Sequence, residues 1–337
     1  MKKKVRLALL GGWHVHTEGF IEKLDAFSKD KVEWKAVWDH DQARGERFAE
    51  KLQVPFVPKL EDILEDTSVD AVMIEAETNL HHELITMAAR AGKHIFTDKL
   101  LAPTMEEAED IRWTVRKEGV KFVISHESLT IRAYQYAKEE VEKGNLGELV
   151  SIYFRRSHGL AKTDVLPASW YEPETAGGGA LMDLGVHGLS LLAYIGSAPE
   201  TISAVTRYIS GKQVEDSASI QVTFQDKQTI GQAHTNLVTA PLDNLLEITG
   251  TEGSLLIYGE KEPLIYQSSG QDKPSRVDVQ ETGEVPVNKF IDLVLGEENQ
   301  TELTGSGLEL DTAVTIVQMA EGAYKSVKQQ GKPVVLK

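Results

Sequence analysis

The sequence has no cysteine among its 337 residues, and aromatic side chains make up only 7% of it. The absence of cysteine excludes disulfides, thiolate zinc sites and cysteine nucleophiles. No apolar run approaches the roughly 18 residues that a membrane-spanning helix needs, so no membrane association is expected. A short apolar run follows the basic start, but it lacks the cleavage site of a signal peptide. We therefore expect a buried first strand in a cytoplasmic protein.

Positive charge is also scarce. Lysine and arginine number 36 against 52 aspartates and glutamates, which gives a formal net charge of −16. Nonspecific nucleic-acid binding depends on a basic surface that releases counterions, so no nucleic-acid partner is expected. The hydrophobic fraction of 41% is ordinary for a globular protein, and the length favours two domains.

The first part of the chain alternates short apolar runs with amphipathic stretches. This pattern predicts βαβ units and therefore a doubly wound parallel sheet in a first domain, residues 1–125. The predicted strands are 5–10, 34–38, 71–74, 94–97 and 121–125, and the clearest helices are 44–52, 82–91 and 105–118.

A different pattern begins near residue 126. Period-two alternation predicts an α+β second domain, residues 126–337, with a large, open, mainly antiparallel sheet. The predicted strands are 149–155, 201–210, 217–224, 229–236, 245–249 and 254–258, and the predicted helices are 133–143 and 308–329. A glycine-rich stretch and helix, 177–195, interrupt the strands, and the polar segment 259–285 is expected to be a surface excursion.

The ends of the first two strands carry residues typical of a dinucleotide site. Gly11 and Gly12 end the first strand, where a pyrophosphate would meet a helix N-terminus. Asp39 ends the second strand, where an acid commonly accepts the ribose hydroxyls of NAD and repels the 2′-phosphate of NADP. The alternative is that Asp39 only begins a turn. A full G-x-G-x-x-G would need further glycines where Trp13 and His16 stand.

Three other residues are candidates for proton-transfer chemistry. Lys99 directly follows the fourth predicted strand, at the ligand-binding edge of the sheet. Asp183 and His187 are four residues apart after three glycines, a spacing that places both on one face of a helix. Each residue also has an ordinary structural interpretation: a solvated lysine, and a hydrogen-bonded pair.

These motifs together resemble the Gfo/Idh/MocA oxidoreductases over essentially the whole chain. Residues 177–187 match the family's GGG-x-L-x-D-x-G-x-H, AGKHIFTDKLLA (residues 91–102) is similar to its A-G-K-H-V-x-x-E-K-P-x-A, and GNLGELVSI (residues 144–152) is similar to its link into the sheet domain. The resemblance implies a Rossmann domain that binds NAD(P), with NAD favoured over NADP because of Asp39, and catalytic roles for Lys99, Asp183 and His187. It also implies hydride transfer between nicotinamide and a hydroxyl carbon of a sugar, polyol or related small molecule, with His187 as the general acid/base. The implied cofactor-binding residues are Gly11, Gly12, Trp13, His14, Asp39, Glu77, Thr78, His81, Asp98 and Lys99.

Four segments depart from the family pattern. Asp98-Lys99-Leu100 replaces E-K-P, residues 76–78 replace T-P-N, Ser190 replaces an aspartate, and residues 124–127 lack the usual Asn and Arg. They suggest a divergent branch with an unusual substrate or with reduced redox activity. In the altered glycine loop we expect His16 or Thr17 to cap the next helix. His14 either donates to the pyrophosphate or only packs.

Three alternatives to a dehydrogenase remain. His14-Val15-His16 resembles the H-x-H of zinc-dependent barrel hydrolases, but eight βα units are incompatible with an antiparallel second half, and no metal is expected. A regulatory protein could keep the fold and sense sugar or dinucleotide without turnover. Redox-assisted hydrolysis or elimination would use the dinucleotide within one cycle. In each case the open sheet favours a homodimer or homotetramer.

Overall fold

The computed structural model describes residues 4–163, 166–240, 242–270, 272–280, 285–299 and 303–336. The chain divides into two compact units. The first comprises Met1–Glu127 with Glu284–Val314, and the second comprises Ser128–Gly283 with Thr315–Lys337. The return of the chain to the first unit differs from the uninterrupted second domain, residues 126–337, expected from the sequence.

The first unit contains the predicted parallel sheet. Its five strands lie in the order β2-β1-β3-β4-β5, and every neighbouring pair is parallel. The strands are β1 (Val5–Leu10), β2 (Val32–Trp38), β3 (Ala71–Ile74), β4 (His94–Asp98) and β5 (Phe122–Ser125). β3 and β5 are buried along their whole length, as strands covered on both faces must be. The Rossmann prediction is confirmed.

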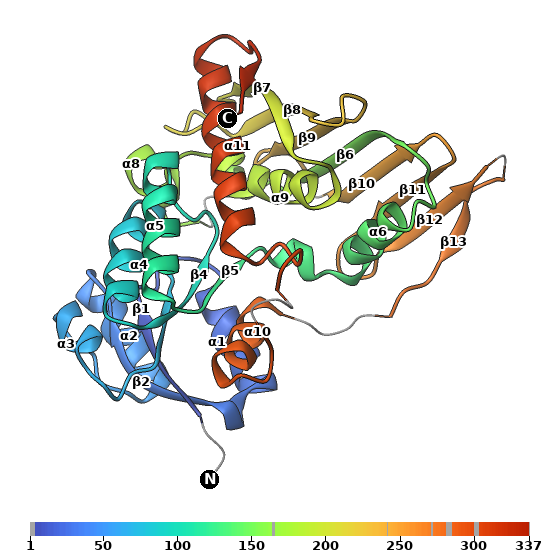
Figure 1. Ribbon diagram of the computed structural model, residues 1–337. Coiled ribbons are helices and arrows are strands. Elements are labelled where there is room, and N and C mark those ends of the chain that lie inside the picture. The colour runs from blue at the N-terminus through green and yellow to red at the C-terminus, as the bar shows by residue number, and fades with distance from the viewer. Residues whose placement is uncertain are drawn as a thin grey trace. The chain divides into compact units, whose positions relative to one another are not determined.

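Local signals fix the helices of this unit. The hydroxyl of Thr104 accepts a hydrogen bond from the Glu107 N–H at the start of α5, and Gly119 ends the helix in the left-handed conformation. The helices are α1 (Thr17–Phe27), α2 (Gln42–Leu52), α3 (Leu60–Leu64), α4 (His81–Arg90) and α5 (Met105–Glu118). Figure 1 shows α4 and α5 packed side by side against the sheet.

A helix late in the sequence completes the first core. α10 (Pro286–Leu295) buries Val287, Phe290 and Ile291 in a hydrophobic cluster with residues of the parallel sheet, among them Phe96. Hydrophobic burial is the largest favourable term in such packing, which explains why the chain returns to this unit. This helix is not among those predicted from the sequence.

The second unit contains a nine-stranded mixed sheet in the order β13-β12-β11-β10-β6-β9-β8-β7-β14. Its pairs are antiparallel apart from β6 with β9. The predicted large, mainly antiparallel sheet is confirmed. The strands are β6 (Leu149–Ser157), β7 (Pro199–Arg207), β8 (Ser217–Phe224), β9 (Ile230–Asn236), β10 (Leu242–Gly250), β11 (Gly253–Tyr258), β12 (Leu264–Ser269), β13 (Ser275–Val277) and β14 (Val334–Val335).

The prediction of a surface excursion over residues 259–285 was wrong for β12 and β13, which extend the sheet there. Residues 271 and 281–284 of this segment lie outside the described residues. β12 and β13 lie at the edge of the sheet and bury little besides Ile265. A strand with one buried position does not produce the alternation of apolar and polar residues on which strand prediction depends.

Helices cover one face of this sheet. α9 (Val186–Ile195) packs on β6 and β9, and α6 (Arg132–Glu142) packs beside α9 (Figure 1). The other α-helices among the described residues are the long terminal helix α11 (Leu310–Lys328) and the short helices α7 (Leu160–Thr163) and α8 (Pro173–Ala176). By length and hydropathy alone, the segment Pro173–Ile195 could cross a membrane, but 78% of its 18-residue apolar window is buried, as in the core helix of a globular domain.

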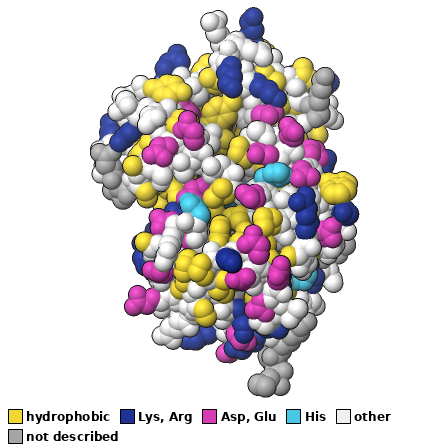
Figure 2. Space-filling view, turned by 90° about the vertical axis from the view of Figure 1, so that its left-hand side faces the viewer, with side chains coloured by type: hydrophobic (Ala, Val, Ile, Leu, Met, Phe, Trp, Pro, Cys, Tyr) yellow, Lys and Arg dark blue, Asp and Glu magenta, His cyan; other side chains and the backbone are white. Residues whose placement is uncertain are grey.

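The acidic side chains do not form a single patch on the face that Figure 2 displays. Acidic and basic side chains alternate there around smaller hydrophobic areas. Such mixing is typical of a solvated protein surface.

Candidate active site

The loop after β1 turns at Gly11, whose φ of +81° favours glycine. A β-carbon at this position would also lie 2.7 Å from the backbone of Ala76, in the loop after β3. The Gly11 N–H donates to the Trp38 carbonyl at the end of β2, with an N–O distance of 2.7 Å. Gly11 thus joins the carboxyl ends of three neighbouring strands, where ligands of parallel sheets bind.

The next two residues turn their backbone N–H groups inward. The N–H groups of Trp13 and His14 both donate to the Glu75 carbonyl, at 3.0 and 3.1 Å. They are therefore used within the protein and not presented to a pyrophosphate. His16 occupies the N-cap position of α1 without a side-chain capping bond, and the Thr17 hydroxyl donates to the His14 carbonyl. The expected cap from His16 or Thr17 was wrong.

Asp98, at the end of β4, contacts both histidines of the loop after β1. Its Oδ2 lies 2.6 Å from Nδ1 of His14 and 3.1 Å from Nδ1 of His16, and its Oδ1 accepts a hydrogen bond from the Lys99 N–H. Burial would raise the pKa of Asp98, but the two histidines hold it well below its ordinary value. Burial lowers the pKa of His14 despite the opposing effect of Asp98. The His14 ring is buried and lies against the Asp98 carboxylate.

Asp39 follows β2 and is paired with a cation that the sequence did not suggest. Its two carboxylate oxygens accept hydrogen bonds of 2.7 Å from Nε and Nη2 of Arg44. Arg44 Nη2 also lies 3.0 Å from Oε1 of Glu77. A bidentate arginine neutralises much of the charge of the carboxylate it holds, so the expected repulsion of a 2′-phosphate by Asp39 is weakened in this arrangement.

His81 connects the loops that follow β3 and β4. It is fully buried at the start of α4, with Nδ1 2.8 Å from the Leu100 carbonyl and Nε2 3.2 Å from the Ala76 carbonyl. Burial lowers its pKa, which favours a neutral ring. Thr78 is buried one turn earlier, and Lys99 is buried directly after β4, where its charge acts on His14.

The glycine-rich stretch of the second unit is locked by a glutamate that the motif does not contain. Oε1 of Glu215 accepts hydrogen bonds from the N–H groups of Gly179 and Leu181, both at 3.0 Å, and from the hydroxyl of Tyr324 at 2.8 Å. A β-carbon on Gly179 would lie 1.9 Å from the Glu215 carbonyl oxygen. The packing explains the glycine without reference to a ligand. Burial raises the pKa of Glu215.

Asp183 and His187 follow this locked stretch. Leu181–Gly185 form a π-helical turn, and α9 begins at Val186, so Asp183 lies in the wide turn and His187 in the first α-helical turn. The predicted continuous α-helix was wrong over Leu181–Gly185. Inserted π turns are common at functional sites, where they redirect side chains.

His187 has a partner that sequence reasoning missed. Its Nδ1 lies 2.8 Å from the hydroxyl of Ser128, and Nη1 of Arg156 lies 3.4 Å from the same hydroxyl. The side chain of His187 is buried, as a ring positioned for proton transfer needs to be. Ser128 directly follows the segment 124–127 that departs from the family pattern, and that departure was the available signal.

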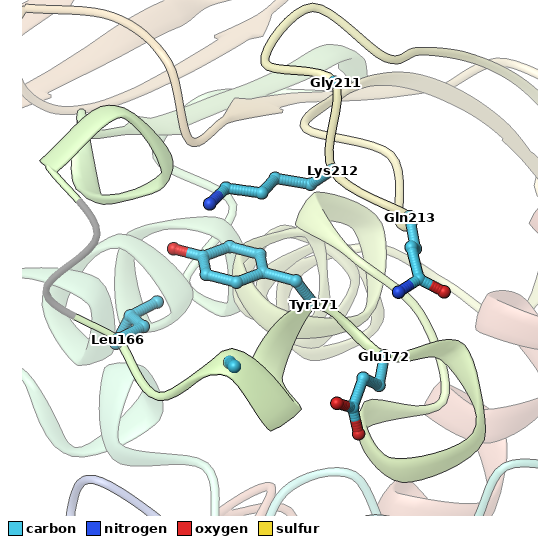
Figure 3. Close-up of a pocket in the computed structure, with 7 residues that line it drawn as sticks. Leu166, Tyr171, Glu172, Gly211, Lys212 and Gln213 are labelled. Atoms are coloured by element: carbon cyan, nitrogen blue, oxygen red, sulfur yellow. The ribbon is translucent and has the colours of Figure 1, made fainter.

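A cavity of about 530 Å³ opens in the second unit. Figure 3 shows Lys212 extending over the ring of Tyr171, with Glu172 and Gln213 nearby. Lys212 Nζ is 4.6 Å from the centre of the Tyr171 ring, a cation–π distance. The cavity falls within the size range of small-molecule sites and combines an aromatic wall with hydrogen-bonding groups.

A five-stranded Rossmann sheet followed by a nine-stranded mixed sheet defines a class of two-domain NAD(P)-binding proteins. Residues 9–126 match the family model "Oxidoreductase family, NAD-binding Rossmann fold", and residues 134–256 match the "GFO/IDH/MocA C-terminal domain". The chain belongs to the Gfo/Idh/MocA family of NAD(P)-dependent dehydrogenases and reductases.

The individual relatives share only modest sequence identity with this chain. The chain is 30% identical to 1,5-anhydro-D-fructose reductase of Ensifer adhaerens over 59% of its own length and 60% of the relative's. It is 26% identical to scyllo-inositol 2-dehydrogenase (NAD(+)) of Bacillus subtilis over 76% and 75%. The chain thus spans less than two thirds of the length of the first of these two relatives.

Solved structures share the whole fold. A putative NADPH-dependent oxidoreductase from Desulfitobacterium hafniense superposes with a TM-score of 0.86 at 20% identity, covering 100% of this chain and 99% of the other. Levoglucosan dehydrogenase in complex with NADH and L-sorbose superposes with a TM-score of 0.84 at 18% identity, covering 99% of each chain.

Proposed function

We propose that this protein transfers hydride between a nicotinamide dinucleotide and a hydroxyl-bearing carbon of a sugar, polyol or related small molecule. The observation that carries the proposal is the complete GGG-x-L-x-D-x-G-x-H stretch, in which His187 is buried and hydrogen-bonded to Ser128. Relatives named for anhydrofructose and inositol support the substrate class.

The residues of the first unit fit a bound dinucleotide. Gly11 lets the backbone approach closely at the carboxyl edge of the sheet, and α1 begins just beyond it with its positive dipole end. Asp39 stands at the end of β2, where a ribose would be recognised. Glu77, Thr78 and His81 follow β3, and Asp98 and Lys99 close β4, in positions suited to the nicotinamide half.

When bound, the dinucleotide accepts or supplies the hydride. In the oxidative direction, His187 takes the hydroxyl proton as the carbon–hydrogen electron pair leaves and the carbonyl forms. Since Nδ1 of His187 is held by Ser128, the proton passes through Nε2. By the family resemblance, Lys99 would stabilise the developing negative charge on the substrate oxygen, and Asp183 would orient the substrate hydroxyls.

NAD remains the preferred cofactor in this proposal, although Arg44 moderates the choice. Asp39 can still accept the two ribose hydroxyls, but its charge is partly neutralised. We therefore expect a preference of only about tenfold, roughly 1.4 kcal/mol, over NADP.

A second copy of the chain would cover the open face of the nine-stranded sheet. Val205 on β7 and Ile230 on β9 expose apolar side chains on this face. Exposed apolar side chains on an open sheet face are suited to burial against a second copy. Light scattering at micromolar concentration should give a dimer or tetramer, and a monomer would reject this part of the proposal.

The experiment that tests the function is a panel of polyols, sugars, anhydrosugars and sugar acids, each with NAD and NADP in both directions. The absorbance of the reduced nicotinamide should change with at least one compound. Tight binding of dinucleotide and sugar without any turnover would favour a sensor. Hydrolysis or elimination without net dinucleotide reduction would favour redox-assisted chemistry.

A further inference from the structure

Two histidines and one aspartate converge at the carboxyl edge of the parallel sheet. His14 and His16 come from the loop after β1, and Asp98 ends β4. One ligand atom from each of the three lies within 4.8 Å of the others. The closest approaches are 2.6 Å and 3.1 Å, from Nδ1 of His14 and of His16 to Oδ2 of Asp98.

Each of these groups is held in place by the fold. The His14 N–H donates to the Glu75 carbonyl, which ties the loop to the end of β3 between the two strands. The Lys99 N–H donates to Oδ1 of Asp98, so Oδ2 is the oxygen turned toward the histidines. Ligands positioned by backbone hydrogen bonds need little reorganisation when an ion enters.

The exposure of the three side chains suits an ion that enters from solvent. The side chains of His14 and Asp98 are 4% and 1% exposed, whereas that of His16 is 33% exposed. Two ligands are therefore desolvated, while the third forms the entrance. Surface clusters of charged groups lack this combination.

A fourth group nearby lacks the positive partner that its burial requires. The side chain of Glu75 is fully buried, and among the described residues its Oε1 has no hydrogen-bond partner. Its Oε2 is 3.5 Å from the Thr17 hydroxyl. A buried carboxylate is costly unless a cation or hydrogen bonds compensate it.

We propose that His14, His16 and Asp98 bind one divalent transition-metal ion of the zinc class. Two imidazoles and one carboxylate form a ligand set that zinc and its neighbours favour, whereas magnesium and calcium prefer oxygen ligands alone. Three protein ligands leave at least one coordination position for water or for an oxygen of an anionic ligand. The ion would compensate the charge of Asp98 and fasten the loop that lacks the usual glycines.

The sequence alone led us to expect no metal. His14-Val15-His16 supplies two ligands, and the third is Asp98, 82 residues after His16. A histidine pair separated so widely from its carboxylate has no sequence signature. The rival interpretation is a hydrogen-bonded cluster in which protons, not a metal, join the three side chains.

The test is metal titration of the tag-free, chelator-treated full chain. Calorimetry with zinc should show one equivalent bound, cobalt should give the visible absorption of a histidine-ligated ion, and magnesium should not compete. Asp98→Asn and His16→Ala should each weaken zinc binding by about 100-fold or more, beyond the usual effect of an outer residue. His16 is partly exposed, so its variant should fold; circular dichroism and melting temperature check this.

His82→Ala is the matched control, because His82 forms a His–Asp pair with Asp110 at 2.8 Å that gains no third ligand from the part of the chain that the structure describes. The His82→Ala chain should bind zinc with the affinity of the wild type. The proposal is rejected if zinc does not bind, or if the folded His16→Ala and Asp98→Asn chains bind as tightly as the control. The titration uses no dinucleotide or sugar, so its outcome is independent of the proposed dehydrogenase activity.

Discussion

Two loops of this protein are built alike although only one matches its family pattern. In the first unit, the N–H groups of Trp13 and His14 donate to the main-chain carbonyl of Glu75. In the second, the N–H groups of Gly179 and Leu181 donate to the side-chain carboxylate of Glu215.

The difference lies in what each loop leaves for chemistry. The second loop keeps the residue types of the family motif and leads to Asp183 and His187. The first loop has lost two glycines, turns its N–H groups inward and presents histidines to Asp98. Proton transfer is therefore expected to follow the family, while dinucleotide and ion binding are expected to differ.

The largest effect should come from the second loop. His187→Ala should lower turnover by roughly 10²- to 10⁴-fold, as loss of a general base does, with dinucleotide affinity unchanged. His234→Ala, on β9, serves as the control and should keep wild-type turnover. Steady-state kinetics and calorimetry separate the two quantities. Near-wild-type turnover in His187→Ala would place the chemistry on other residues.

A pair of glycine substitutions compares the two regions by stability. Gly179→Ala should destabilise the protein by about 1–3 kcal/mol, because its β-carbon would overlap the Glu215 carbonyl oxygen. Gly19→Ala, in α1, meets nothing within 4 Å and should stabilise the protein by about 0.5–1 kcal/mol. Urea denaturation measures both. Equal effects of the same sign would contradict the close packing around Gly179.

The third prediction concerns cofactor choice. Asp39→Asn should remove the preference of about tenfold for NAD over NADP, because it removes the charge that repels a 2′-phosphate. Arg44→Gln should increase that preference, because Asp39 then keeps its full charge. Calorimetry with both dinucleotides checks this. Unchanged ratios in both variants would show that the pair does not set the choice.

The smallest effect concerns pH. Burial raises the pKa of Glu215 above the ordinary glutamate value of 4.5, so the folded chain binds a proton that the unfolded chain releases. Its contribution to stability is fully present below pH 4.5 and is lost as pH rises through the folded-state pKa. Relative to Glu215→Gln, the wild type should lose at most about 1.4 kcal/mol per pH unit in that window. A parallel pH dependence of urea midpoints in both proteins would be the contrary result.

Much of the architecture could be predicted because it rests on local patterns. The bounds of β1, β3, β8 and α5 follow from apolar runs and capping residues, and the structure reproduces them. α10 and the edge strands β12 and β13 could not be identified, since their stability depends on distant partners or on a single buried position.

The candidate site shows the same division. Lys99, Asp183 and His187 stand in motifs and can be named from the sequence, and their roles stay predictions. Ser128, Glu215 and Arg44 act through contacts with residues that the sequence does not pair with them. Hydrogen bonds between side chains far apart in the chain produce no periodic pattern in the sequence from which they could be predicted.

The central claim is that hydride passes between a carbinol carbon and the nicotinamide. The most direct measurement uses a sugar or polyol that is active in the panel and carries deuterium on that carbon, with mass spectrometry of the dinucleotide. The account predicts reduced dinucleotide that contains the deuterium, formed together with the ketone product. If no compound yields labelled, reduced dinucleotide while dinucleotide and sugar both bind, the claim is contradicted.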